Sequence, residues 1–254
     1  MRFKNAIVRT PCRNMTYGLT EAEMGKPDYD LALMQHAQYI AALKQCGLDV
    51  LVMEADEDFP DSTFVEDTAL LTPACAIITR PGAQSRRGET ASMASELKKY
   101  FQTIEAIQPP GTVDAGDIMM VGDHYYIGLS GRTNPSGAQQ LIRILERHHM
   151  TASTVTVPHA LHLKAGVAYL ENNHVVITEE FWNQPDFNRF KQIRVNPQES
   201  YAANCVWING TVLVANGFPE TLKAIEAAGY KTISLDMSEF QKLDGGLSCL
   251  SLRF

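Results

Sequence analysis

The sequence predicts an α/β fold in which short β-rich modules repeat around a ring, within a single domain that spans residues 1–254. Two observations predict it: short β-rich runs occur in pairs separated by turn residues, and these pairs recur along the chain. With 45% hydrophobic and 20% charged residues, the chain has the composition of an ordinary globular protein. A chain of 254 residues can bury a full core without disulfides or metal ions.

Three hairpins carry the repeat. Residues 171–174 (ENNH) separate VAYL from VVIT, Asn209-Gly210 separates CVWI from TVLVA, and residues 122–124 (GDH) separate DIMMV from YYIGL. Asn-Gly is among the strongest short hairpin signals. When the chain is aligned on its hairpins, first strands begin roughly every 40 to 50 residues, a period typical of propellers and arrays. These starting positions are Asp67, Asp117, Gly166, Asn204 and Cys249.

The two ends of the chain complete this pattern. The run CLSLRF at 249–254 has no hairpin partner, and the run KNAIVRTP at 4–11 has no preceding strand. We therefore expect the two terminal strands to pair and close a ring, with the start of each first strand facing the centre. A doubly wound parallel sheet is the alternative, but it does not explain so many two-strand hairpins.

Four segments are predicted to be helices. The first is amphipathic, and its predicted buried face consists of Leu33, Ala37, Ile40 and Leu43. The last begins at Pro219, a residue tolerated in the first helical turn. In chain order the expected helices span about 28–46, 89–101, 135–150 and 219–229.

Charge and cysteine usage exclude several functional classes. The net charge is −7 and no basic stripe is present, so a nucleic-acid partner is not expected. No run approaches 18 consecutive apolar residues, so no membrane association is expected either. The five cysteines include no CxxC pair, which suits free thiols in a reducing compartment and predicts a cytoplasmic protein.

A cysteine and a histidine are candidates for chemistry. Cys249 follows Gly245-Gly246, and strand alternation would place it on the same side as Leu247 and Ser251. His162 lies between two leucines and could serve as its acid and base, because a cysteine needs a lowered pKa to attack as a thiolate. The alternative is a buried core thiol and a hydrogen-bonded structural histidine.

Acidic and basic residues suggest what such a pair could act on. Carboxylates that open apolar runs are costly unless a cation pairs with them, and a substrate guanidinium could do so in a bidentate manner. Two arginines in loops could hold a carboxylate, so the pocket suits an arginine-like amino acid; surface arginines and solvated turns are the alternative. The residues concerned are Asp61, Glu66, Asp67, Asp114, Asp117, Arg86 and Arg132.

Other motifs fail. The histidines at 148, 149, 159 and 162 lack the spacing of a zinc site, so no metal is expected. Neither the phosphate-binding loop G-x-x-x-x-G-K-[ST] nor the dinucleotide fingerprint G-x-G-x-x-G is present, so no nucleotide cofactor is expected.

Several long motifs resemble one enzyme family. They are FPDSTFVED, ITRPGAQSRRGE, GTVDAGDIMMVGDHYYIG, GRTNPSGA, LHLKAGVAYL, YAANC and DGGLSCLSLRF. Together, and in this order, they resemble the dimethylarginine dimethylaminohydrolases of the pentein, or guanidine-modifying, superfamily. The resemblance implies a five-bladed β/α propeller of ββαβ modules closed by the N- and C-terminal strands. It also implies hydrolysis of asymmetric dimethylarginine and monomethylarginine to citrulline and an alkylamine, without a cofactor.

The resemblance also implies residue roles. Cys249 corresponds to the nucleophile, which forms a covalent thiouronium intermediate, and His162 to the general acid/base. Asp114 corresponds to the third catalytic position, where some relatives have glutamate. Residues 26–29 complete a mobile lid that begins near residue 19. The substrate-binding positions are Leu19, Asp61, Phe64, Glu66, Asp67, Arg86, Arg132 and Ser248, with Phe64 as a wall of the pocket.

Alternatives remain at this stage. An arginine or agmatine deiminase shares the cysteine, histidine and acid, but arginine deiminases are longer and agmatine has no carboxylate for the arginines. A non-catalytic pentein that only binds its ligand is the alternative from another class. The resemblance implies a homodimer, while the preference among methylated arginines cannot be read from the sequence.

Overall fold

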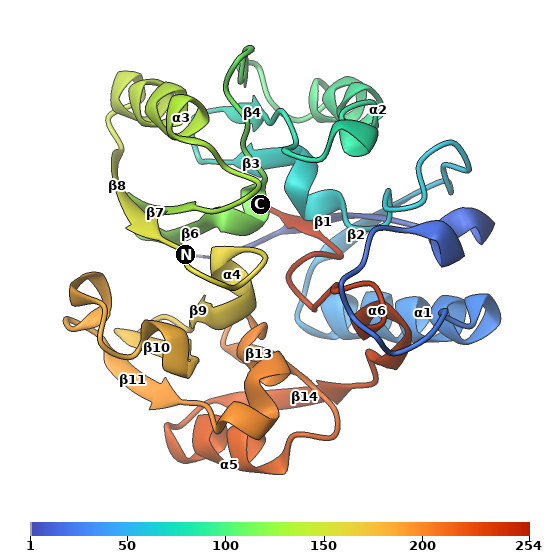
Figure 1. Cartoon of the computed structure of the whole chain (residues 1–254), viewed down its shortest axis with the longest axis vertical. Coiled ribbons are helices and arrows are strands. Elements are labelled where there is room, and N and C mark those ends of the chain that lie inside the picture. The colour runs from blue at the N-terminus through green and yellow to red at the C-terminus, as the bar shows by residue number, and fades with distance from the viewer. Residues whose placement is uncertain (1) are drawn as a thin grey trace.

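The structure, a computed structural model, describes residues 2–254. Within these residues, fifteen strands form five three-stranded sheets around a common centre (Figure 1). The strands are β1 Asn5–Arg9, β2 Asp49–Met53, β3 Ala69–Leu71, β4 Ala76–Ile78, β5 Ile104–Ala106, β6 Ile118–Val121, β7 His124–Leu129, β8 Thr151–Thr156, β9 Val167–Tyr169, β10 His174–Ile177, β11 Lys191–Arg194, β12 Val206–Ile208, β13 Thr211–Ala215, β14 Lys231–Leu235 and β15 Leu252–Arg253.

All five sheets have the same topology. A first strand pairs antiparallel with a second strand, which pairs parallel with a third, as in β3-β4-β5, β6-β7-β8 and β12-β13-β14. Neighbouring modules meet through their first strands, because β6 contacts β9, β9 contacts β12 and β15 contacts β3. The predicted ring of repeated α/β modules is confirmed.

The terminal strands close the ring. β15 pairs antiparallel with β1, in the register Ala6↔Arg253 and Ile7↔Leu252, and β1 pairs parallel with β2. The fifth module is therefore built from both ends of the described chain, as expected. The strand predicted from Cys249 onward is wrong in extent, because residues 247–250 form a turn and β15 begins only at Leu252. The alternation predicted for Leu247, Cys249 and Ser251 therefore does not apply.

Helices cover the outside of the modules. The four predicted helices are present, and the later three end two to four residues earlier than expected. Asp28 caps the first by accepting a hydrogen bond from the Leu31 N–H at 3.0 Å. The helices are α1 Tyr29–Gln45, α2 Glu89–Leu97, α3 Pro135–Arg147, α4 Leu163–Gly166, α5 Pro219–Ala227 and α6 Ser238–Gln241.

The predicted buried face of α1 is only partly right. Leu43 is buried, but Ala37 is exposed and the buried side is formed by Ala32, Gln35, His36, Tyr39, Ala42 and Leu43. Polar residues turn inward here because they find partners, as when the Gln35 amide donates to the Ser238 hydroxyl at 2.8 Å and accepts from the Glu239 N–H. A face chosen from apolar residues alone therefore misses the true one.

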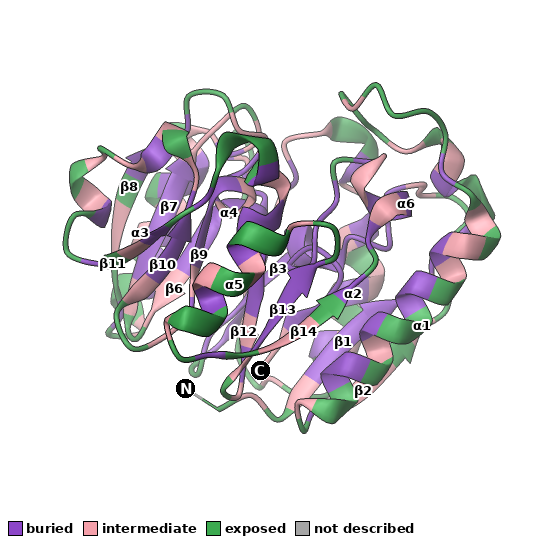
Figure 2. Cartoon of the chain, turned by 90° about the horizontal axis from the view of Figure 1, so that it is seen from below, coloured by how far each residue is buried: buried purple, intermediate pink, exposed green. Residues whose placement is uncertain are grey.

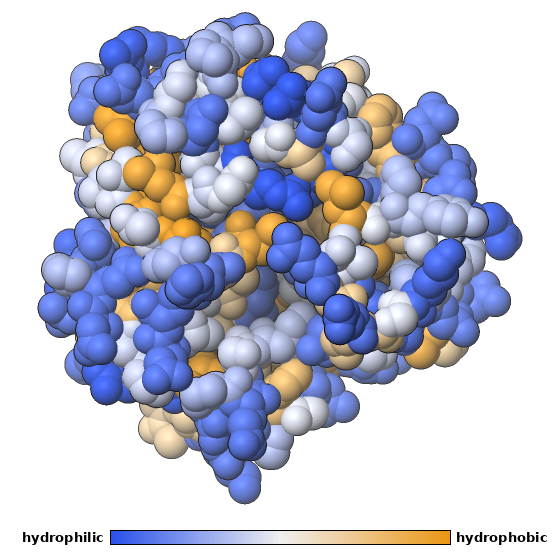
Figure 3. Space-filling model, in the orientation of Figure 1, coloured by the Kyte–Doolittle hydropathy of each residue, from blue (hydrophilic) through white to orange (hydrophobic). Residues whose placement is uncertain are grey.

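Polar residues gather where the first strands begin, as predicted. Short 3-10 segments, η2 Val65–Thr68 and η4 Ala115–Asp117, precede β3 and β6, while α4 precedes β9. The first and second strands of each module are mainly buried, whereas the third strands are mostly intermediate or exposed, namely β2, β5, β8, β11 and β14. α4 and α6 lie at the opposite end of the ring from the chain termini (Figure 2). Figure 3 shows hydrophilic side chains around the rim of the ring and hydrophobic ones between its modules.

A membrane span was not expected from the sequence. Among residues 2–254, no helix is long and apolar enough to cross a bilayer.

Ring closure predicts that the stability of the fold is sensitive to substitutions in the contact between β1 and β15. Ile7 is fully buried and pairs with Leu252, so Ile7→Ala removes apolar contacts between both terminal strands and leaves a cavity. We expect the free energy of unfolding to fall by about 2–5 kcal/mol, measured by urea denaturation. Val52→Ala, at a position 42% exposed on β2, is the control and should cost less than about 1 kcal/mol. Equal losses in both variants would contradict the role assigned to ring closure.

Candidate active site

A small pocket brings together most of the predicted site residues. Its volume is about 30 Å³, room for little more than water. Three lining residues were not predicted, Leu161, Leu243 and Asp244, although each is close in sequence to His162 or to the glycine pair that includes Gly245. The lining consists of Leu19, Asp61, Phe64, Asp67, Arg86, Arg132, Leu161, His162, Leu243, Asp244, Gly245 and Cys249.

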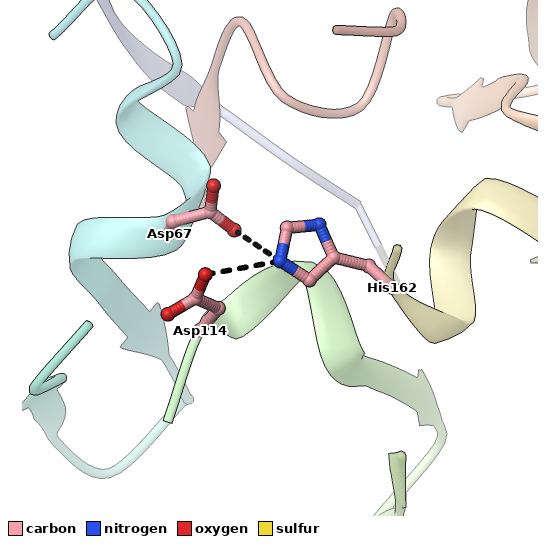
Figure 4. A group of neighbouring side chains, drawn as sticks. All are labelled: Asp67, Asp114 and His162. Atoms are coloured by element: carbon pink, nitrogen blue, oxygen red, sulfur yellow. Dashed lines mark hydrogen bonds and ion pairs between the residues drawn. The ribbon is translucent and has the colours of Figure 1, made fainter. Parts of the chain in front are cut away.

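The histidine is held by carboxylates. His162 Nε2 lies 3.0 Å from Asp114 Oδ2 and 4.0 Å from Asp67 Oδ1 (Figure 4). Asp114 is fully buried and also accepts a hydrogen bond from the Gly82 N–H at 2.8 Å. Burial alone would lower the pKa of His162, but Asp67, Asp114 and Asp117 outweigh it and raise that pKa to about 9. At neutral pH His162 is therefore an imidazolium that donates to Asp114.

A glycine allows this close approach. The Gly116 N–H donates to Asp67 Oδ1 at 3.0 Å, and a Cβ at this position would lie 2.8 Å from both that oxygen and His162 Nδ1. Any larger residue would push the carboxylate and the imidazole apart. The segment DAGD thus supplies both an acid and the space for its partners.

Asp117 supports the loop that carries the histidine. Its Oδ1 accepts from the Leu163 N–H at 3.0 Å and its Oδ2 from the Ser130 hydroxyl at 2.7 Å. Asp117 is fully buried, and burial raises its pKa despite these donors. It therefore positions the start of α4 and with it His162.

The cysteine lies in a tight turn beside the pocket. Cys249 is 9% exposed, and the Gly246 N–H lies 3.4 Å from its Sγ. Burial, together with the carboxylates of Glu66 and Asp67, raises the pKa of the Cys249 thiol to about 12. The free protein therefore holds a neutral thiol and a protonated histidine in the lining of one pocket.

The two predicted arginines differ in availability. Arg86 is buried, and its guanidinium donates to Asp67 Oδ2 at 2.6 Å, to both carboxylate oxygens of Glu89, and to the carbonyls of Asp61 and Phe64. The Arg132 side chain is 23% exposed and reaches within 3.9 Å of Asp114 Oδ2. Although both arginines line the pocket, Arg132 is the freer of the two to bind a ligand carboxylate.

Glu66 and Ser248 are not among the residues that line this pocket. The Glu66 carboxylate pairs with Lys164 Nζ at 2.7 Å and Arg253 at 3.2 Å, and it accepts from the Ser248 hydroxyl at 2.7 Å. These four residues line a second cavity, of about 150 Å³, together with residues of the inner strands. The two cations hold the Glu66 carboxylate here, so Glu66 and Asp67, both predicted to bind the substrate, line two different cavities.

The predicted lid segment lies over the pocket. The Leu19 N–H donates to Asp61 Oδ1 at 2.9 Å, the Thr20 hydroxyl to the Lys242 carbonyl at 2.8 Å, and the Glu21 N–H to Asp244 Oδ2 at 2.6 Å. These contacts fasten Leu19 to the loop before η2, and Thr20 and Glu21 to the loop after α6. The small pocket volume is therefore that of a closed arrangement.

Three side chains of the site are close enough together to be considered as metal ligands. Side-chain atoms of Asp67, Asp114 and His162 all lie within 4.8 Å of one another, a group that could hold a metal ion. A protonated imidazole cannot act as a ligand, so His162, with its raised pKa, would have to lose a proton first.

A thiol, an imidazolium and carboxylates around a pocket at the centre of a five-module ring define a pentein-fold enzyme with a cysteine nucleophile. A sequence model of the family described as "N,N dimethylarginine dimethylhydrolase, eukaryotic" matches residues 20–195. The chain is 52% identical to N(G),N(G)-dimethylarginine dimethylaminohydrolase of Pseudomonas aeruginosa, over 99% of this chain and 100% of that protein.

Two further comparisons agree. The chain is 37% identical to the enzyme of the same name from Streptomyces coelicolor, over 100% of this chain and 98% of the relative. The solved structure of the Pseudomonas aeruginosa C249S mutant complexed with citrulline matches with a TM-score of 0.99 and 51% identity, over 100% of both chains. The chain belongs to the dimethylarginine dimethylaminohydrolase family.

The carboxylates around His162 predict a specific titration. Asp114→Asn removes a negative partner at 3.0 Å, so the pKa of His162 should fall below its present value of about 9. Nuclear magnetic resonance titration of labelled histidine measures it. Asp123→Asn, at an exposed turn, is the matched control and should leave the pKa unchanged. An unchanged His162 titration in Asp114→Asn would contradict the assigned origin of the shift.

Proposed function

We propose that this protein hydrolyses Nω-methylated arginines to citrulline and an alkylamine. The observation that carries the proposal is the shared pocket of Cys249 and His162, in which Asp67 and Asp114 offer negative charge. Two relatives at 52% and 37% identity are named for this reaction, and the citrulline complex of a C249S mutant comes from the first of them. Residues 1–254 form a single catalytic unit in this proposal.

The charges of the pocket set the orientation of the substrate. The guanidinium lies against Asp67 and Asp114, because carboxylates pair with its planar N–H groups. The amino-acid carboxylate lies toward Arg132, and Phe64 forms part of the wall between the two ends. Because a cavity of about 30 Å³ cannot hold an arginine, residues 19–21 must release Asp61 and Asp244 for the substrate to enter.

The first half of the reaction forms a covalent intermediate. The Cys249 thiolate adds to the guanidinium carbon, and an electron pair of the carbon–nitrogen bond moves onto nitrogen. His162 then gives its proton to the methylated nitrogen, and the carbon–nitrogen bond breaks to release dimethylamine or methylamine. A positively charged S-alkylthiouronium remains on Cys249, and His162 is now neutral.

The second half regenerates the enzyme. Neutral His162 takes a proton from water, and the oxygen adds to the carbon bound to sulfur. The carbon–sulfur bond then breaks, the sulfur leaves as a thiolate, the proton of the added hydroxyl passes to solvent, and the carbon becomes the urea carbon of citrulline. Asp114 keeps the imidazole oriented throughout, because it binds Nε2 in both halves.

The products of several guanidines test this function. Asymmetric dimethylarginine and monomethylarginine should give citrulline with dimethylamine or methylamine, and Cys249→Ser should give neither. L-arginine and agmatine serve as competing substrates in the same assay, with citrulline and amine quantified by mass spectrometry. Release of ammonia from arginine with no turnover of the methylated substrates would instead identify a deiminase. Tight binding without turnover would identify a non-catalytic binding protein.

We also propose that the substrate promotes ionisation of its own nucleophile. Because burial and two carboxylates hold the pKa of the Cys249 thiol near 12, a bound guanidinium that offsets those charges should lower it. In His162→Ala, which cannot protonate the leaving amine, added monomethylarginine should raise the thiolate absorbance measured by ultraviolet difference spectroscopy. Cys249→Ser should show no such change. A thiolate signal of equal size without ligand would refute substrate-promoted ionisation.

The oligomeric state and the cellular location are also part of the proposal. We propose a homodimer, on the resemblance to bacterial relatives, and analytical ultracentrifugation measures this directly. We also propose a cytoplasmic location, because all five cysteines are unpaired, as free thiols are in a reducing compartment.

A further inference from the structure

Asn204 contacts the nucleophile from a module that has no other assigned role in catalysis. It follows the 3-10 segment η7, Pro197–Ala203, and opens the fourth module just before β12. The residue is 8% exposed. The amide Oδ1 accepts a hydrogen bond from the Ser248 N–H at 2.9 Å, and Nδ2 lies 4.0 Å from Cys249 Sγ. One amide therefore touches both the backbone beside the nucleophile and its sulfur.

The turn around the cysteine is shaped to this amide. A Cβ at Gly246 would lie 2.4 Å from Asn204 Cγ, so the amide packs directly against a glycine backbone. The same glycine directs its N–H toward Cys249 Sγ at 3.4 Å. Asn204 and Gly246 thus form one packed unit with the sulfur.

Few groups can donate to this sulfur. Among residues 2–254, those within hydrogen-bonding distance of it are the Gly246 N–H, the Asn204 amide and the Ser248 hydroxyl. The Ser248 hydroxyl already donates to Glu66 Oε2 at 2.7 Å. Two neutral N–H donors therefore remain for the sulfur.

The charged groups around the sulfur do not replace these donors. Glu66 and Asp67, from η2, act against a thiolate, and Lys164, from α4, favours it. Lys164 is already paired with Glu66 at 2.7 Å, while protonated His162 is bound to Asp114. The remaining neighbours, Tyr39 and Tyr201, carry hydroxyls that donate to the carbonyls of Leu247 and Gly245.

We propose that Asn204 is a catalytic residue that stabilises the Cys249 thiolate by donating an amide N–H to it, while its Oδ1 holds the Ser248 backbone in place. The proposal rests on the proposed function for its kinetic part only. The amide transfers no proton; the thiol proton leaves to solvent when the cationic substrate binds. Because the sulfur is negative both before it attacks and when it is expelled, Asn204 acts in both halves of the reaction.

Two variants of Asn204 distinguish the loss of its N–H donor from the effects of added negative charge and of altered packing. Asn204→Asp keeps the shape and the acceptor for the Ser248 N–H, but it replaces the donor with a carboxylate. Asn204→Ala removes the donor without adding charge. Asn209→Asp is the matched control, since the Asn209 Oδ1 likewise accepts a backbone N–H, that of Phe3, but at the opposite end of β12, where its Nδ2 donates to the Phe3 and Cys46 carbonyls.

The readout is the rate at which iodoacetamide alkylates Cys249 at pH 8, with the other four cysteines replaced by serine or alanine in every variant. Below the pKa of the thiol, this rate follows the thiolate fraction, so a rise of about one in that pKa slows alkylation about tenfold. We expect at least this loss in both Asn204 variants, and none in Asn209→Asp. The kcat for dimethylarginine should fall similarly, with KM changed less than about threefold because Asn204 does not line the substrate pocket.

Each outcome decides the matter. Slower alkylation in Asn204→Asp alone would overturn the proposal, because added charge explains it without a lost donor. Unchanged alkylation in both variants, with circular dichroism matching the parent, would also overturn it. If Asn204→Ala fails to fold, Asn204→Ser replaces it as the uncharged variant. Because alkylation needs no substrate, a failure of the proposed function leaves this measurement intact, and the two failures are distinguishable.

Discussion

Buried negative charge at the centre of the ring is the constraint on which the rest of the site depends. Asp67, Asp114 and Asp117 are all at most 3% exposed, a position that is costly for a carboxylate without a partner. Arg86 pairs with Asp67, His162 pairs with Asp114, and backbone and hydroxyl donors satisfy Asp117. The protonated state of the histidine is therefore part of how the fold tolerates its own charges.

Asp67 acts on both partners of the reaction. Together with Asp114 and Asp117 it raises the pKa of His162. Burial, together with Glu66 and Asp67, raises the pKa of Cys249, so the free protein holds both protons and is not ready to attack. A cationic substrate changes this balance, whereas a neutral urea such as citrulline does not. In the proposed reaction the substrate guanidinium is converted into a neutral urea. The product therefore does not promote ionisation of Cys249, and the carboxylates bind it more weakly than the substrate. Substrate selectivity, activation of the thiol and product release thus all depend on the negative charge of the pocket.

Much of this arrangement could be predicted from the sequence. The hairpin spacing predicted the ring, and the polar starts of the first strands predicted that Asp67 and Cys249 would meet. The sequence could not show that Glu66 would turn away toward Lys164, because adjacent residues in a 3-10 segment point in different directions and the choice depends on distant cations. Asn204 was seen only as a strand start, since its role depends on packing against Gly246, which is distant in sequence and lies on the segment between β14 and β15.

Ring closure by the first and last strands has a consequence for biosynthesis. Cys249 and β15 follow every other described module in chain order, and β15 must find β1, which leaves the ribosome before the other described strands. The nascent chain therefore carries His162 and its carboxylates long before it carries a nucleophile. Cys249 and β15, the strand that closes the ring, are synthesised within a few residues of each other. The nascent chain therefore acquires its nucleophile and the strand needed to complete the fold at almost the same time.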